Sequence, residues 1–202
     1  MVASFQTLSM LNGEGDRWPC RMLICGQSEA RRFHADIDPT HVLSIVTPGR
    51  SYLGPKDVAP DHHLKVAFDD VESPGSPGAP TREIVETIVA WAAGLPASAR
   101  LCLHGLQGVR RAPAIGLGLL AGAAAPGQAA AALPTFCRHA PTPNLLVVSL
   151  FDEVWGLQGG LIDACEARFV PSVATLRRRT ESDHGDFAFD MLIGGAERAG
   201  HG

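Results

Sequence analysis

The sequence lacks the cysteine patterns of a disulfide-stapled or zinc-binding protein. Its five cysteines are an odd number, none forms a C-x-x-C pair, and they are spread along the chain at Cys20, Cys25, Cys102, Cys137 and Cys165. The first residues also lack the positively charged and then apolar pattern of a secretory signal. These absences favour reduced thiols and a cytoplasmic location.

A strong positive charge and long apolar runs are missing as well. With 17 Lys and Arg against 21 Asp and Glu, the net charge is -4, and the basic residues cluster only at residues 177–179. Nucleic acid is therefore not expected as a partner, because affinity for its backbone comes mainly from clustered Lys and Arg. The longest uncharged stretch, which begins at Ala112, holds only about 14 apolar residues before Pro126, so no membrane span is expected.

Metal-ligand clusters are scarce. His62 and His63 are adjacent, and Asp183 precedes His184, but neither pair has further Cys or His residues at ligand spacing. We therefore expect no metal and no cofactor.

The sequence does contain enough apolar side chain for one packed domain. Its 202 residues are 46% hydrophobic and 19% charged, which suits a single core. We expect residues 1–20 to be an N-terminal arm, because they show no hydrophobic periodicity. Residues 21–167 are expected to form the domain, and residues 168–202 a C-terminal tail that is flexible or orders on a protein partner.

Short apolar runs and helical periodicities alternate along the predicted domain. Strands are expected over residues 21–25, 41–46, 63–68 and 100–104. Helices are expected over residues 28–35, 81–94, 111–124 and 127–133, and from Asn144 onward. Ser28 is the expected cap of the first of these helices, and Pro134 is expected to end the fourth. This order predicts an α/β fold, a three-layer sandwich with a largely parallel central sheet flanked by helices.

The helix that starts at Asn144 carries an apolar stripe. We expect Val147, Leu150 and Val154 to face inward, because they recur at helical spacing. Asp152 and Glu153 are expected on its solvated face.

Residues 104–111 join a predicted buried strand to a predicted helix through a loop that contains glycine and ends in arginine. At such a junction the loop and first-turn N–H groups point toward one centre, and the helix dipole favours negative charge there. Arginine adds a planar fork that can bind two oxygens at once. We predict an oxyanion cradle, with phosphate as its ligand, made by His104, Gly105, Leu106, Gln107, Gly108, Val109, Arg110 and Arg111.

Simpler roles stay open for three of these residues. Arg111 could instead pair with a carboxylate on the surface, and Arg110 is expected to be exposed. His104 ends a buried strand, where a histidine is often a hydrogen-bonded core residue, although it could also orient the loop.

The loop resembles the signature loop of the cysteine-dependent protein tyrosine and dual-specificity phosphatases, His-Cys-x-x-Gly-x-x-Arg-Ser/Thr. His104, Gly108 and Arg111 match that pattern at its spacing. The resemblance extends from about Met22 to about Cys165 and is nearest to the bacterial predicted tyrosine phosphatases. It departs from the family at two positions, because Gly105 stands where the catalytic cysteine is expected and Ala112 where Ser or Thr is expected.

The resemblance also implies roles for individual residues. In the family the cysteine attacks phosphorus, the arginine clamps the phosphoryl oxygens, and an aspartate on a mobile loop protonates the leaving group. Arg111 matches the arginine, and Asp69 or Asp70 matches the aspartate, with Asp70 slightly favoured; a turn or capping role is the alternative for both. Gly105 has no side chain to form a phospho-enzyme. Cys102 lies three residues away along the strand, roughly 10 Å, and is expected to be a buried apolar residue.

Three functions follow from these residues. We expect foremost a pseudophosphatase, not an active enzyme, that binds a phosphorylated protein or a small phosphate or oxyanion. The first alternative is a weakly active phosphatase in which Asp69 or Asp70 activates water. The second is a structural or assembly subunit in which the loop has collapsed and its amides bond elsewhere.

Overall fold

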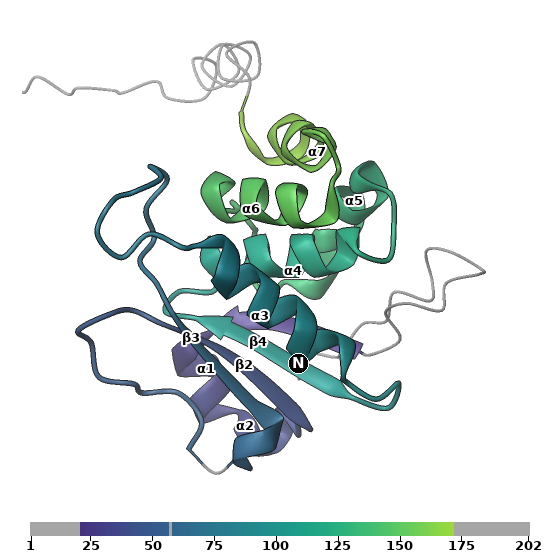
Figure 1. Ribbon diagram of the computed structural model, residues 1–202. Coiled ribbons are helices and arrows are strands. Elements are labelled where there is room, and N and C mark those ends of the chain that lie inside the picture. Colours follow the sequence, from purple (N-terminus) through teal and green to yellow (C-terminus); the bar gives the residue numbers. More distant parts are fainter. Residues whose placement is uncertain (1–20, 57, 172–202) are drawn as a thin grey trace, which may run out of the picture. The chain divides into compact units, whose positions relative to one another are not determined.

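The computed structural model describes residues 21–56 and 58–171 (Figure 1). The predicted N-terminal arm and almost all of the predicted tail, with its basic cluster at residues 177–179, lie outside the described residues. The four strands are β1 (Arg21–Gly26), β2 (His41–Val46), β3 (His63–Ala67) and β4 (Arg100–Gly105). The α-helices are α1 (Gln27–Arg32), α2 (His34–Ile37), α3 (Arg82–Ala93), α4 (Arg111–Ala121), α5 (Pro126–Phe136), α6 (Leu145–Trp155) and α7 (Gly160–Phe169).

All four strands are parallel, in the order β1-β4-β2-β3. Gly26 pairs with Gly105, and Ser44 pairs with His104, so the carboxyl ends of β1, β4 and β2 lie at one edge of the sheet. The loop predicted to bind an anion leaves β4 at this edge, which is where parallel sheets commonly bind ligands. The predicted α/β architecture with a largely parallel sheet is confirmed.

The two faces of the sheet are covered unequally (Figure 1). The short helices α1 and α2 lie on one face, whereas α3 and α4 cover the other, with α6 packed on them and α7 on α5 and α6. The large core on the α4 face includes Met22, Ile24, Leu43 and Leu103. The α1 face carries a much smaller apolar cluster of Cys25, Ala30, Val42 and Cys102.

The first helix differs from its prediction. Instead of one helix over residues 28–35 capped by Ser28, α1 begins at Gln27 with Gly26 as its N-cap, and the separate α2 follows. The Glu29 carboxylate reaches back and accepts the Gly26 N–H at 2.9 Å. This bond to the third helical residue fixes the start of the helix before Ser28 is reached.

The small-residue helices also end elsewhere than predicted. The helix α4 stops at Ala121, and α5 runs from Pro126 to Phe136 with Pro134 inside it. The prediction that Pro134 ends the helix is therefore wrong. Pro134 lies in the last turn of α5 and lacks only the hydrogen bond that its own N–H would donate. The buried Leu133 and Phe136 hold that turn against the core.

The helix α6 carries the largest surprise among the predicted faces. Val147 is buried, as predicted, and Leu150 and Val154 pack against the core while partly exposed. Phe151 and Asp152, which the pattern did not assign to the inward face, are also buried. Asp152 is 5% exposed, so its predicted place on a solvated face is wrong. Its carboxylate accepts the N–H groups of Gly159 and Leu161, both at 2.7 Å, and so fixes the start of α7, which the sequence did not predict.

No helix within residues 21–56 and 58–171 is long and apolar enough to cross a bilayer.

Candidate functional site

The loop that follows β4 surrounds a cavity of about 150 Å³ at the carboxyl edge of the sheet. We call it the cradle. A water molecule takes up about 30 Å³ in the liquid, so the cradle has room for a tetrahedral oxyanion. Its lining residues are Asp70, Gly105, Leu106, Gln107, Gly108, Val109, Arg110, Arg111 and Ala112. Of the residues predicted for the loop site, only His104 does not line it.

Three carbonyl groups near the two ends of the loop accept backbone hydrogen bonds. The Leu106 carbonyl oxygen accepts the Gln27 N–H at 3.4 Å, and the Val109 carbonyl oxygen accepts the Thr142 N–H at 2.8 Å. The Arg110 carbonyl oxygen accepts the Ala114 N–H at 3.0 Å. These bonds turn the Leu106, Val109 and Arg110 carbonyl groups toward the protein.

The amide groups of the loop are not used in this way. Among the described residues, no backbone acceptor takes the N–H of Gln107, Gly108, Val109 or Arg110. The loop leads directly into α4, whose first turn leaves further N–H groups without intrahelical partners. A loop with bonded carbonyls and unbonded amides beside a cavity can accept an anion.

Gly108 is required by this loop. Its φ is +74°, and a Cβ at this position would lie 2.3 Å from the Cys25 carbonyl carbon and 2.5 Å from the Gly26 nitrogen. Both neighbours are backbone atoms of β1 and cannot move aside. The loop therefore keeps its curvature only with glycine at this position.

Gly105 is not required in the same sense. A Cβ added there would meet nothing nearer than the Ile45 Cδ1 atom at 3.7 Å and the Ala112 Cβ atom at 3.8 Å, which are ordinary contacts. The cradle thus has space for a side chain at the position where the resembled family has its nucleophile.

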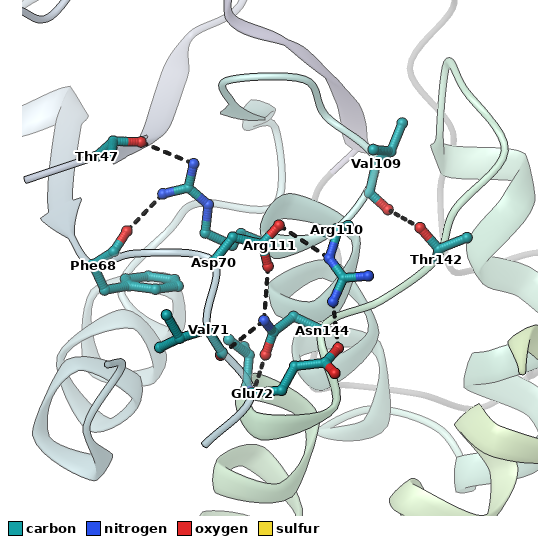
Figure 2. Close-up of polar contacts among 11 residues, drawn as sticks. Thr47, Phe68, Asp70, Val71, Glu72, Val109, Arg110, Arg111, Thr142 and Asn144 are labelled. Atoms are coloured by element: carbon teal, nitrogen blue, oxygen red, sulfur yellow. Dashed lines mark hydrogen bonds and ion pairs between the residues drawn. The ribbon is translucent and has the colours of Figure 1, made fainter. Parts of the chain in front are cut away.

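Arg111 is 7% exposed, lines the cradle and extends toward Thr47 and Phe68 (Figure 2). Its Nη1 donates to the Phe68 carbonyl oxygen at 2.6 Å, and its Nη2 donates to the Thr47 hydroxyl at 3.0 Å. Burial lowers the pKa of the guanidinium, while the Asp70 and Asp69 carboxylates act in the opposite direction. Since arginine stays protonated at neutral pH, a positive charge is held beside the cradle. No carboxylate in the described part of the chain forms an ion pair with Arg111.

One wall of the cradle is built by charged and amide side chains from three separate segments (Figure 2). The Asp70 carboxylate pairs with the Arg110 Nε at 3.0 Å and accepts a hydrogen bond from the Asn144 Nδ2 at 2.8 Å. Arg110 also pairs with Glu72, and the Arg110 side chain is 37% exposed. The structure therefore separates the two candidate aspartates. Asp70 lines the cradle, whereas Asp69 does not, and the Asp69 N–H bonds the Gly78 carbonyl oxygen at 2.7 Å.

Asn144 is a site residue that the sequence indicated only as a helix start. Its Oδ1 accepts the Val147 N–H at 3.1 Å and caps α6, and its Nδ2 holds both Asp70 and the Val71 carbonyl oxygen. The cap was visible in the sequence, but the contact across 74 residues was not.

His104 lies under the loop in a polar network on the α1 face of the sheet. Its Nε2 is 2.7 Å from the Ser44 hydroxyl oxygen, which is also 2.8 Å from the His63 Nε2 and 3.0 Å from the Tyr52 hydroxyl. Burial lowers the pKa of His104 to about 3 and that of His63 to about 4, so both rings are neutral at pH 7. The structure places His104 as a core residue that supports the end of β4. Sequence reasoning missed Ser44, Tyr52 and His63. Strand register brings Ser44 and His63 to His104, and the segment that follows β2 brings Tyr52.

None of the described residues that line the cradle is a cysteine. Cys102 is fully buried with its Sγ 3.8 Å from that of Cys25, and this contact together with burial raises the pKa of Cys102. Burial also raises the pKa of Cys137 to about 12 and that of Cys165 to about 11. Within the described residues, no group of three or more His, Cys, Asp or Glu side chains could hold a metal ion.

No protein-family profile matches the sequence, and no curated protein matches it. Solved structures do resemble the fold. A crystal structure of PTPMT1 in complex with PI(5)P is 14% identical with a TM-score of 0.48, over 68% of this chain and 90% of that one. Human DUSP28 is 19% identical with a TM-score of 0.43, over 68% and 94%. The human tyrosine phosphatase-like serine/threonine/tyrosine-interacting protein is 16% identical with a TM-score of 0.45, over 69% and 93%.

These structures carry the family names that the sequence resemblance predicted.

Proposed function

We propose that this chain is a phosphatase-like protein that binds a phosphorylated protein or a small oxyanion in the cradle and does not hydrolyse it. One observation carries the proposal. Four consecutive loop amides, from Gln107 to Arg110, lack a backbone acceptor in the described protein. They lie beside the cradle, in which Gly105 stands where the resembled family has its nucleophile.

Binding is supported by three contributions that act on the same point. The loop amides donate hydrogen bonds, the N-terminus of α4 carries a partial positive charge, and Arg111 adds a full one. Burial of Arg111 strengthens its effect, since a charge in a poorly solvated place is weakly screened.

Absence of turnover is supported by the side chains that would have to react. Gly105 cannot form a covalent intermediate, and loss of a covalent nucleophile lowered the rate by about 10⁶ in a well-studied protease. Ala112 has no hydroxyl. Asp70 lines the cradle, but Arg110 and Asn144 already engage its carboxylate.

The setting of this protein belongs to the same proposal. Cys25, Cys102, Cys137 and Cys165 are free thiols, which is in keeping with a reducing cytoplasm. We place contact with a protein partner in residues 168–202.

A weakly active phosphatase is the second candidate, favoured by the position of Asp70 in the cradle lining. A carboxylate that activates water adds only about 10² to 10⁴ in rate, so turnover would be slow. Hydrolysis of a fluorogenic phosphate ester that disappears in both Arg111→Ala and Asp70→Asn would establish this candidate.

A purely structural subunit is the third candidate. It requires loop amides that bond elsewhere in the protein, and the bonded carbonyls and unbonded amides of the loop speak against it.

Calorimetric titration with tungstate and with a phosphotyrosine peptide tests the proposal. We expect the native protein to bind both. Arg111→Ala should lose about 10- to 100-fold in affinity, as expected for the loss of a charge-assisted hydrogen bond. Arg100→Ala is the matched control, because Arg100 pairs with Asp38 at the opposite end of the sheet. Arg111→Lys keeps the positive charge. Its melting temperature shows whether a loss of binding comes from a loss of folding. Absence of binding by the native protein would refute the proposal.

A further inference from the structure

A second pocket adjoins the cradle. It has a volume of about 260 Å³, and its lining includes Gln27, Thr47, Arg50, Leu53 and Leu106. We call it the side pocket. Leu106 lines both cavities, and Thr47 accepts the hydrogen bond from Arg111. Whatever is attached to an anion in the cradle therefore finds the side pocket next to it.

The side pocket exposes apolar surface. Leu53 is 52% exposed and Leu106 is 44% exposed, and only two other large apolar side chains in the described part of the chain are comparably exposed. Exposed leucines beside a polar cavity are a favourable surface for a hydrocarbon or aromatic group.

Arg50 adds a positive charge that no carboxylate of the described residues neutralises. Arg100, Arg110 and Arg138 each form an ion pair with a carboxylate. Within residues 21–56 and 58–171, no such pair and no side-chain hydrogen bond involves Arg50, which is exposed. Its guanidinium is available to an acidic group of a ligand.

The segment that carries Arg50 and Leu53 is fixed at both ends. Thr47 is tied to Arg111, and the Arg50 N–H bonds the Thr47 carbonyl oxygen at 3.1 Å. Tyr52 bonds Ser44 and donates to the Pro55 carbonyl oxygen at 3.0 Å, with the Lys65 ammonium 4.6 Å from the centre of its ring. The side pocket is thus preformed, which reduces the entropy lost on binding.

We infer that the ligand of the cradle is a phosphate monoester with an apolar stem and a second acidic group. The apolar stem packs against Leu53 and Leu106, and the second acidic group pairs with Arg50. This inference rests on the proposed function and narrows its ligand class. A phosphate ester without a second negative charge would leave Arg50 unpaired and bind more weakly.

Calorimetry with three probes tests the inference: tungstate, acetyl-Ala-phosphotyrosine-Ala-amide and acetyl-Glu-phosphotyrosine-Glu-amide. The native protein should bind the glutamate peptide about three- to fivefold more tightly than the alanine peptide, as expected for a solvent-exposed ion pair, and the advantage should shrink at high salt. Arg50→Gln should remove the advantage and leave tungstate binding unchanged. Arg21→Gln is the matched control, because it removes the same charge at the start of β1, at the other end of that strand from the cradle.

A substitution of Leu53 tests the contact between the side pocket and the apolar stem of the ligand. Leu53→Ser should weaken both peptides by about three- to tenfold relative to tungstate, since only the peptides place an aromatic ring beside it. If tungstate binds but the two peptides bind equally, or if Arg50→Gln keeps the glutamate preference, the inference fails and the proposed function stands. If the native protein binds no probe, both fail.

Discussion

The loop side and the reactive side of the cradle differ in what they retain. The loop side keeps a curved main chain, the obligatory Gly108 and the buried Arg111. The reactive side has Gly105 and Ala112 in place of reacting groups, and its one carboxylate, Asp70, is engaged by Arg110 and Asn144. The proposed anion binding depends on a backbone shape that the whole fold enforces, whereas turnover would depend on single side chains. The contact distances around Gly105 show that a Cβ would fit there without a clash.

The largest effect is expected when the loop side is deformed. Gly108→Ala places a Cβ against the backbone of Cys25 and Gly26 and imposes a positive φ on alanine. We expect anion affinity to fall below detection and the free energy of unfolding to fall by about 3 kcal/mol. Calorimetry and chemical denaturation measure the two effects.

Gly75→Ala is the matched control for this change. Gly75 also has a positive φ, +77°, but a Cβ added there would meet no atom of another segment within 4 Å. It should lose only about 1 kcal/mol and keep its affinity for tungstate. Equal effects of the two variants would mean that the contact between the loop and β1 does not shape the cradle.

Restoring a side chain on the reactive side sharpens the comparison. Gly105→Cys should fold normally, and its new thiol should have a pKa below about 6.5, because loop amides, the α4 N-terminus and Arg111 stabilise the thiolate. Ultraviolet absorbance of the thiolate against pH measures this. Gly127→Cys, in the first turn of α5 and away from the cradle, shows the contribution of a helix N-terminus alone. A thiol pKa near 8.5 at position 105 contradicts the account of the loop side.

Acid should weaken the support beneath the loop. The pKa of His104 is about 3 in the folded protein and about 6.5 when unfolded, so the unfolded state binds more protons between these values. Stability is therefore lost as pH falls, by about 2 kcal/mol between pH 6.5 and 5 from His104 alone. Denaturation at several pH values should show a flatter dependence in His104→Gln. The exposed His62→Gln serves as control, and an unchanged slope in His104→Gln would rule out this linkage.

The smallest effect is expected on the wall of the cradle. Asp70→Asn removes a negative charge next to the bound anion and should tighten tungstate binding by about three- to tenfold. Glu72 pairs with the same Arg110 but does not line the cradle, so Glu72→Gln should change the affinity for tungstate less. Weaker binding by Asp70→Asn would show that Asp70 supports the site through Arg110 instead of opposing the anion.

Local pattern predicted one side of the cradle better than the other. The strand, the loop and the helix of residues 100–121 are continuous in sequence, so the spacing of Gly108 and Arg111 was enough to predict their layout. The wall joins Asp70, Arg110 and Asn144 from distant segments, and the support joins Ser44, His63 and His104 across three strands. No local spacing encodes those contacts. Asp152 was misjudged for a related reason, because the N–H groups that it accepts lie at the start of the next helix, α7.

A crystal structure of the native protein grown with tungstate tests the central claim most directly. The account predicts tungstate in the cradle, within hydrogen-bond distance of the N–H groups of Gln107 to Arg110, with the Arg111 guanidinium beside it. An empty or flattened loop whose amides bond protein acceptors, with Arg111 facing bulk water, would contradict the account.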